Sequence, residues 1–284
     1  MKEHIQNIKK RGLDTHKGDF GHVFVVAGSV GMTGAAYLTS QTALLCGSGL
    51  VTLGIPESLN DIMEIKLTEV MTLPLEQTVS RTLSLKAEKR IMDFSEKVNV
   101  CALGPGLSTN KKTLTLIRKI VPKLKVPLVL DADGLNAIST NVGLLKKRKA
   151  ATVITPHLGE MARLTGKSVK RIENFKENVA KEFAMKYNVV VVLKGYNTVI
   201  ADTNGQTFIN TTGNSGMSTA GTGDVLTGII ASLIGQGIHP YSAAVLGVYM
   251  HGKAGDLVAK EKGQFSLIAT DILKALPRIF KDIV

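Results

Sequence analysis

Short apolar runs alternate with amphipathic stretches along most of the 284-residue chain. Several runs carry β-branched residues on both faces, as parallel strands do when helices cover both sides of a sheet. The expected strands are 22–28, 50–55, 98–104, 127–133, 151–156 and 189–195, and the expected helices lie near 35–46, 110–120, 158–164 and 171–187. This alternation predicts an α/β fold with a doubly wound, mostly parallel sheet and helices on both faces.

The pattern changes after the last of these strands. Residues 197–202 and 206–210, joined by a turn at 203–205, predict a β-hairpin. Helical periodicity dominates from there to the C-terminus. No repeat, low-complexity tract or linker divides the chain, so residues 1–284 are expected to form a single domain.

Small and polar residues gather where the expected strands end. They are Gly28, Gly104, Gly106, Asp131, Asp133, His157, Lys194 and Gly195. Because open α/β sheets bind ligands beyond the carboxyl ends of their strands, these residues predict one long cleft.

The composition fits a folded chain rather than a disordered one. Hydrophobic residues make up 44% and charged residues 20%, which is enough for a large core. Cys46 and Cys101 lie in apolar contexts without partners at metal-binding spacing, so both are expected to be buried thiols. We expect no signal peptide and no membrane helix, and hence a cytoplasmic protein.

The formal net charge of +12 favours anionic partners. However, the Lys and Arg clusters are short and scattered, aromatic residues make up only 5%, and there is no tryptophan for base stacking. A nucleic-acid-binding or nucleotide-sensing protein is therefore the weaker alternative, and we expect no nucleic-acid partner.

A stretch of small residues, Gly221-Thr222-Gly223, precedes Asp224 and a run with helical spacing. Backbone N–H groups at such a helix start can converge on a phosphate, and an aspartate there is expected to be ionised. It could then accept a proton from a hydroxyl that attacks the phosphate. Asp224 could instead be a simple helix cap. The small residues before it, and Gly228 after it, favour phosphoryl transfer.

The sequence A-G-T-G-D at 220–224 resembles the anion-hole and base motif of ribokinase-like enzymes, and its surroundings resemble those of the ADP-dependent NAD(P)H-hydrate dehydratases. Further segments support this resemblance in order: HKGDFGHVFVVAGS (16–29), MTGAAYLTSQTALLCGSGLVTL (32–53), LGPGLS (103–108), LDADGLNAI (130–138), TPHLGE (155–160) and VVLKGYNTVIAD (191–202). Two departures are Ser215, where proline is frequent, and Ser218, where alanine is frequent. The resemblance implies a ribokinase-like fold.

The resemblance also implies a lyase, an ADP-dependent (S)-NAD(P)H-hydrate dehydratase. It would restore hydrated NADH or NADPH (NADHX or NADPHX) while converting ADP to AMP and phosphate, with Mg²⁺ as cofactor and ATP as an alternative co-substrate. Asp224 would be the catalytic base. The implied nucleotide site comprises Lys194, Gly195, Tyr196, Asn197, Thr198, Asn214, Gly221, Thr222 and Gly223. The implied site for the hydrated cofactor comprises Ala35, Ala36, Gly106, His157 and Asp224, and Glu160 would organise Mg²⁺ indirectly. We further expect a homo-oligomer without an N-terminal epimerase domain.

Three assignments stay open. His157 follows a strand end, which favours ligand contact, but it could simply begin a helix. Asp131 and Asp133 could be paired carboxylates or a cap and a turn, so neither is assigned to catalysis. The rival function is a ribokinase-like kinase for a small alcohol such as a vitamin precursor; the resemblance places Asn at the position of His157 in most such kinases.

Overall fold

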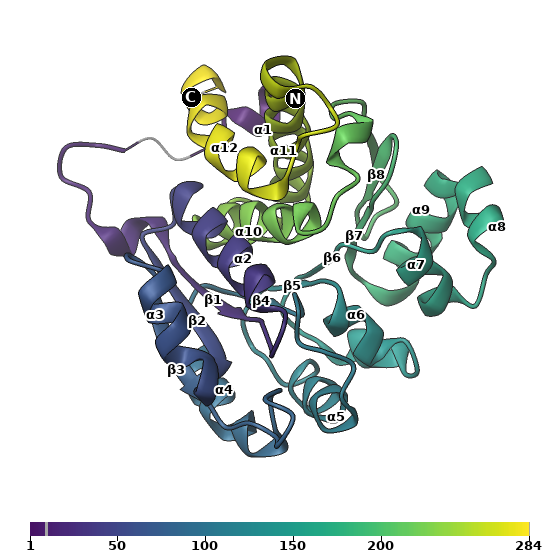
Figure 1. Cartoon of the computed structure of the whole chain (residues 1–284). Helices are drawn as coiled ribbons and strands as arrows, with labels where there is room; N and C mark the ends of the chain where they lie inside the picture. The colour runs from purple at the N-terminus through teal and green to yellow at the C-terminus, as the bar shows by residue number, and fades with distance from the viewer. Residues whose placement is uncertain (9–10, 284) are drawn as a thin grey trace.

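The computed structural model describes residues 1–8 and 11–283, and its centre is one nine-stranded sheet (Figure 1). In spatial order the strands are β3 (Met71–Leu75), β2 (Leu50–Pro56), β1 (His22–Val26), β4 (Val100–Leu103), β5 (Leu128–Leu130), β6 (Thr152–Ile154), β7 (Val190–Leu193), β8 (Thr198–Ala201) and β9 (Thr207–Asn210). Neighbouring strands are parallel from β3 to β7. Strands β7, β8 and β9 pair antiparallel.

Helices cover both faces of this sheet, as predicted. One face carries α2 (Thr33–Leu45), α3 (Asn60–Lys66), α10 (Thr222–Gly235), α11 (Pro240–Lys262) and α12 (Ala269–Ile283). The other carries α4 (Glu88–Ser95), α5 (Lys111–Ile120), α6 (Asp133–Ile138), α7 (Leu158–Thr165), α8 (Val169–Asn174) and α9 (Lys176–Tyr187). Along β1, Val23 and Val25 pack with the first group and Phe24 and Val26 with the second, because successive strand side chains point to opposite faces.

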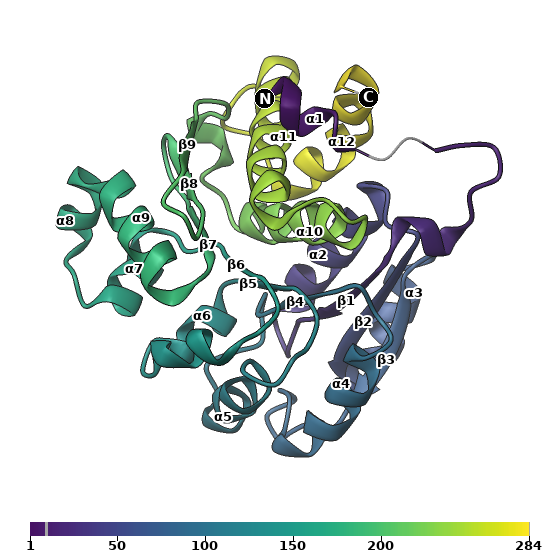
Figure 2. The same ribbon diagram turned by 180° about the vertical axis from the view of Figure 1, so that it is seen from behind.

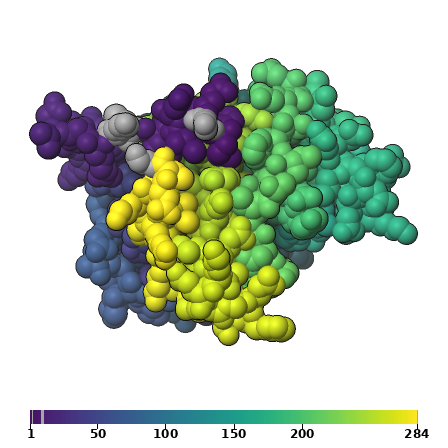
Figure 3. Space-filling view, turned by 90° about the horizontal axis from the view of Figure 1, so that it is seen from above, coloured from purple at the N-terminus to yellow at the C-terminus, as the bar shows by residue number. Residues whose placement is uncertain are grey.

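The N-terminal helix α1 (Lys2–Ile5) packs against α11 and lies beside α12 in both ribbon views (Figures 1 and 2). Seen from above, the N-terminal segment (purple) lies against the C-terminal helices (yellow), and the region of α7–α9 (teal) projects at the opposite end (Figure 3). Short 3₁₀ helices lie at Lys17–Phe20, Glu57–Leu59, Leu85–Ala87, Val142–Lys147 and Ser215–Met217. None of the described helices combines the length and the apolar character that a membrane span needs.

The predicted strands and the hairpin are confirmed, although most strands are shorter than expected. The pattern does not predict α1, β3, α3, α4 or α6. Strand β3 lies at the sheet edge, contains Pro74 and buries only Leu75, so it lacks the continuous buried run of the central strands. The single helix expected at 171–187 is wrong: α8 and α9 are separate because Phe175 (φ −131°, ψ 38°) leaves the helical region between them.

Close packing between α2 and α10 fixes the N-terminus of α10. A Cβ at Gly228 would lie 2.5 Å from the carbonyl oxygen of Thr39, so glycine is required there. Thr39 Oγ1 donates to the carbonyl oxygen of Asp224 at 3.2 Å. Gly228 therefore serves helix packing, which corrects its interpretation as a sign of phosphoryl transfer.

Candidate active site

A cleft of about 1130 Å³ opens at the carboxyl ends of β5, β6 and β7, beside the N-terminus of α10. It exceeds the ~300–1000 Å³ of typical small-molecule sites and has room for more than one ligand. The predicted site residues that line it are His157, Glu160, Lys194, Gly195, Tyr196, Asn197, Thr198, Asn214, Gly221, Thr222, Gly223 and Asp224. Most of the predicted site thus lies in one cavity.

The glycine turn before α10 has the geometry of an anion-binding site. Gly221 is left-handed (φ 91°), and a Cβ there would lie 2.5 Å from Leu38 Cδ1. Thr222 Oγ1 donates to the carbonyl oxygens of Met217 (3.0 Å) and Thr219 (3.1 Å), which holds the turn from behind. The first N–H groups of a helix have no partner within the helix and attract anions. The turn can therefore receive a phosphate.

Asp224 is the third residue of α10 and lines the cleft. Burial, followed by the negative charge of Asp131, raises the pKa of Asp224 to about 7, although the Lys194 ammonium opposes the rise. The sequence predicts an ionised Asp224, but with this pKa the group is only partly ionised near neutral pH, because lost hydration outweighs the field of the helix N-terminus. A carboxyl group with this pKa can exchange a proton near neutral pH, as a general base must.

A buried ion pair lies beside the glycine turn. Asp131, directly after β5, is 1% exposed; its Oδ1 accepts from Lys194 Nζ at 2.8 Å and its Oδ2 accepts from Thr227 Oγ1 at 2.8 Å. Lys194 Nζ also lies 3.9 Å from Glu160 Oε2. Burial alone lowers the pKa of Lys194, but the neighbouring carboxylates outweigh burial and raise it. Lys194 is therefore charged, and its Nζ lies 3.3 Å from where a Cβ of Gly223 would be.

The structure resolves the open assignment of Asp131 and Asp133. Asp131 lines the cleft and holds Lys194 and Thr227. These partners lie 63 and 96 positions away in sequence, so no local pattern could reveal them. Asp133 Oδ2 accepts from the backbone N–H of Ser108 at 2.8 Å, which ties the start of α6 to the loop after β4. Asp131 therefore belongs to the cleft, whereas Asp133 connects α6 to that loop.

His157 both caps α7 and lines the cleft. Its Nδ1 accepts from the N–H groups of Gly159 (2.9 Å) and Glu160 (3.2 Å), and Glu160 Oε2 accepts from the His157 N–H (2.8 Å). The helix-start interpretation is thus confirmed, and ligand contact stays a prediction. Burial, with the charge of Lys194, lowers the pKa of His157. The ring is neutral, and because Nδ1 accepts, Nε2 carries the proton. This Nε2 lies 3.5 Å from Glu160 Oε1, and its N–H could also donate to a ligand.

Asn214 lines the cleft, but its side chain already has partners. Nδ2 donates to Asp256 Oδ1 and Oδ1 accepts from the Gly216 N–H, both at 3.0 Å. Asp256 Oδ2 also accepts from the Gly213 N–H at 3.0 Å. Asn214 therefore shapes its loop, and its contact with a nucleotide phosphate stays a prediction.

Ala35, Ala36 and Gly106 are not among the residues that line this cleft. A Cβ at Gly106 would lie 3.0 Å from Ala35 Cβ, so these two residues adjoin, whereas Ala36 is fully buried. Ala35 precedes Thr39 by one helical turn, and Thr39 contacts the Asp224 backbone. Ala35 and Gly106 thus lie on the α2 side of Asp224, and their contact with the hydrated cofactor stays a prediction.

The carboxylates of the cleft fit a magnesium ion that arrives with a nucleotide. Mg²⁺ usually binds through one or two carboxylates together with substrate phosphates and water. Within residues 1–8 and 11–283, no three His, Cys, Asp or Glu side chains gather into a dedicated metal site. Glu160 lines the cleft, and burial raises its pKa, so a nearby cation would favour its charged form. Glu160 is the residue that would help to hold the ion.

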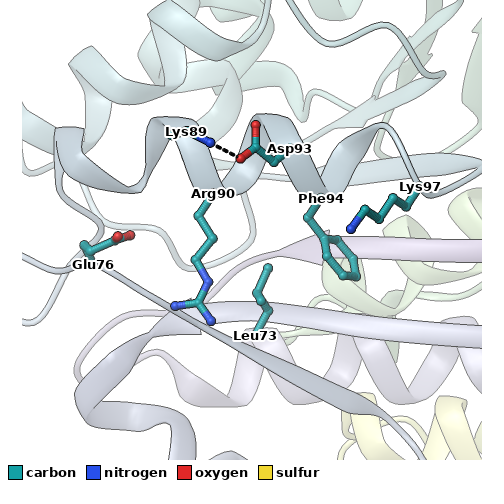
Figure 4. A pocket seen from close by; sticks show the side chains of 7 residues that line it. All are labelled: Leu73, Glu76, Lys89, Arg90, Asp93, Phe94 and Lys97. Atoms are coloured by element: carbon teal, nitrogen blue, oxygen red, sulfur yellow. Dashed lines mark hydrogen bonds and ion pairs between the residues drawn. The ribbon is translucent and has the colours of Figure 1, made fainter.

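A smaller hollow of about 350 Å³ lies at the other edge of the sheet, between β3 and α4 (Figure 4). Its lining residues are Leu73, Glu76, Lys89, Arg90, Asp93, Phe94 and Lys97. Lys89 pairs with Asp93 across one helical turn, and both side chains are exposed. Ion pairs between exposed side chains contribute little to the free energy of folding. The exposed Lys89–Asp93 pair therefore contrasts with the buried Lys194–Asp131 pair of the larger cleft.

Comparison with known proteins identifies the family of the chain. The family model for NAD(P)H-hydrate dehydratase matches residues 23–278. The chain is 44% identical over 276 residues to the bifunctional NAD(P)H-hydrate repair enzyme of Moorella thermoacetica, covering 97% of this chain and 52% of that protein. It thus spans about half the length of that relative.

Two further proteins match over most of their length. The ADP-dependent (S)-NAD(P)H-hydrate dehydratase of Neisseria meningitidis is 33% identical over 273 residues, covering 94% of this chain and 88% of that protein. The solved ADP/ATP-dependent NAD(P)H-hydrate dehydratase of Bacillus subtilis, co-crystallised with ATP and Mg²⁺, superposes with a TM-score of 0.86 at 30% identity, covering 100% of this chain and 98% of that one. The predicted ribokinase-like fold and family resemblance are therefore confirmed. The chain belongs to the NAD(P)H-hydrate dehydratase family.

Proposed function

We propose that the chain is an ADP-dependent (S)-NAD(P)H-hydrate dehydratase, which returns hydrated NADH or NADPH to the reduced cofactor and converts ADP to AMP and phosphate. The observation that carries this proposal is Asp224, whose pKa is raised to about 7, beside a turn that can receive a phosphate. The names of the relatives in N. meningitidis and B. subtilis support the same activity and co-substrate.

In the first step the Asp224 carboxylate takes the proton of the C6 hydroxyl of the hydrated nicotinamide ring. The hydroxyl oxygen attacks the β-phosphorus of ADP, the bond from that phosphorus to the bridging oxygen breaks, and AMP leaves. The N–H groups of the glycine turn and the Lys194 ammonium stabilise the charge on the transferred phosphoryl group. Bound Mg²⁺, held near Glu160 and the phosphates, would supply further positive charge.

In the second step the phosphate ester at C6 is eliminated. The lone pair of the ring nitrogen expels phosphate, and loss of a proton from C5 restores the dihydropyridine. Phosphate is a far better leaving group than hydroxide, so a kinase-like site can drive a dehydration. The neutral ring of His157 would position the nicotinamide through its Nε2–H group.

Residues 1–284 are proposed to form a single domain that acts on the S epimer. The cytoplasmic location and homo-oligomeric assembly expected from the sequence belong to the same proposal. A vitamin kinase would share Asp224 and the glycine turn. His157 favours the dehydratase, because the resemblance places Asn at this position in most such kinases.

Purified protein with Mg²⁺ and ADP should convert the S epimer of hydrated NADPH to NADPH and release AMP. The growth of the dihydropyridine absorbance measures the first product, and chromatography measures the second. Parallel reactions with ATP in place of ADP show which nucleotide is the preferred co-substrate. If the hydrated cofactor is untouched while a vitamin alcohol is phosphorylated, the kinase is the correct function.

The activity should depend on the ionisation of Asp224. The pKa of this group is raised to about 7, chiefly by burial, and only its ionised form can accept the proton. We therefore expect kcat/KM to fall as the pH drops below about 7 and to level off above it, because kcat/KM reports ionisation in the free enzyme. A series of kcat/KM values across the neutral range tests this. A flat profile would show that no group with this pKa acts as the base.

A further inference from the structure

The loop between β7 and β8, residues 195–197, lines the cleft and has an unusual distribution of hydrogen bonds. All three of its carbonyl oxygens accept a hydrogen bond from a side chain. Thr198 Oγ1 donates to Gly195 at 2.9 Å, and Lys176 Nζ donates to Tyr196 at 2.7 Å and to Asn197 at 3.1 Å. Lys176 is the first residue of α9 and lies outside the cleft lining.

The three N–H groups of the same loop have no hydrogen-bond partner among residues 1–8 and 11–283. Asn197 has a left-handed backbone (φ 54°), which few non-glycine residues adopt. Successive N–H groups around a left-handed residue form concave sites for anions and other acceptors. The side chains of Thr198 and Lys176 thus occupy the carbonyl acceptors of the loop, and its N–H donors remain available.

We propose that Lys176 is a positioning residue for the nucleotide. By holding the carbonyl oxygens of Tyr196 and Asn197, its ammonium keeps the loop in the conformation that offers three N–H donors to acceptor atoms of ADP. This inference rests on the proposed function, because it takes ADP as the ligand of the loop. Lys176 does not touch the reacting atoms, so it should govern nucleotide affinity and leave the chemical step unchanged.

Calorimetric titration with Mg²⁺-ADP tests the inference in four proteins: the wild type, Lys176→Met, Lys176→Arg and the control Lys170→Met. Lys170 lies on α8, is exposed, and its side chain forms no hydrogen bond or ion pair within the described chain. Lys170→Met removes one positive charge, as Lys176→Met does. Kd should rise roughly tenfold in Lys176→Met, since hydrogen bonds to charged groups are the stronger ones, and should change less than about twofold in Lys170→Met.

Two further readouts separate positioning from general stability. At saturating ADP, kcat of Lys176→Met should stay within about threefold of the wild type. Lys176→Arg should recover most of the affinity, because a guanidinium also offers several donors to two carbonyl oxygens. Amide hydrogen exchange should quicken in residues 195–198 of Lys176→Met and not in the core strands.

An unchanged Kd in folded Lys176→Met, with a wild type that binds ADP, would overturn the inference and leave the proposed function intact. A fall in kcat that matches the rise in Kd, or faster exchange throughout the protein, would also overturn it. A wild type that binds no adenine nucleotide would overturn the proposed function itself, and the inference with it.

Discussion

Replacement of Asp224 by Asn is expected to lower kcat by roughly 10²–10⁴-fold, the usual contribution of a general base. Asparagine has nearly the same shape and cannot accept the hydroxyl proton. ADP should bind as tightly as before or more tightly, because the change removes a negative charge beside the phosphates and leaves the N–H groups of the glycine turn in place. Steady-state kinetics and calorimetry on the purified variant measure both effects.

The turnover of the same variant distinguishes a base from a helix cap, and its stability tests the raised pKa of Asp224. Asn caps a helix about as well as Asp, so a mere cap predicts nearly full activity in Asp224→Asn. The pKa of Asp224 is raised from 3.8 to about 7 in the folded protein, so its stabilising contribution is present below pH 3.8 and is lost as the pH rises through about 7. The melting temperature of the variant relative to the wild type should therefore increase across this range. Near-normal turnover would reduce Asp224 to a cap.

Replacement of Asp131 by Asn is expected to lower the free energy of unfolding by about 3 kcal/mol, because it leaves the charge of Lys194 buried without its closest partner. Denaturant unfolding at neutral pH measures this change. Asp93→Asn is the matched control, since it removes a carboxylate from the exposed pair with Lys89 and should cost ~0–1 kcal/mol.

Asp131 also has a predicted effect on the pH profile. Among the charged neighbours of Asp224, Asp131 raises its pKa most, and Lys194 lowers it. Loss of the Asp131 charge should therefore lower the pKa of Asp224 and move the acidic limb of kcat/KM to lower pH. Equal unfolding free energies for the two variants, with an unshifted limb, would show that the ion pair neither stabilises the fold nor tunes the base.

Much of the fold could be predicted from the sequence, because the central strands are continuous apolar runs and the hairpin has a clear turn at 203–205. Edge strand β3 is not predictable in this way because it contains Pro74 and buries only Leu75. The split between α8 and α9 was missed because Phe175 is an ordinary apolar residue in the helical pattern.

The candidate site could be predicted where a single segment carries its chemistry, as at the glycine turn with Asp224. It could not be predicted where the chemistry depends on contacts between distant segments. Asp131 meets Lys194 across 63 positions, and the burial that raises the pKa of Asp224 comes from the assembled fold. Lys176 carries no motif at all, and only its contacts with Tyr196 and Asn197 reveal it.

The central claim is that the C6 hydroxyl attacks phosphorus before it leaves the ring. The fate of that oxygen tests the claim most directly. Hydrated NADPH carrying the heavy isotope of oxygen at C6 is incubated with the protein, Mg²⁺ and ADP, and the released inorganic phosphate and water are analysed by mass spectrometry. The proposed mechanism predicts that the label appears in phosphate, one labelled oxygen for each NADPH formed. Label found in water instead would show direct dehydration and contradict the role assigned to Asp224 and the glycine turn.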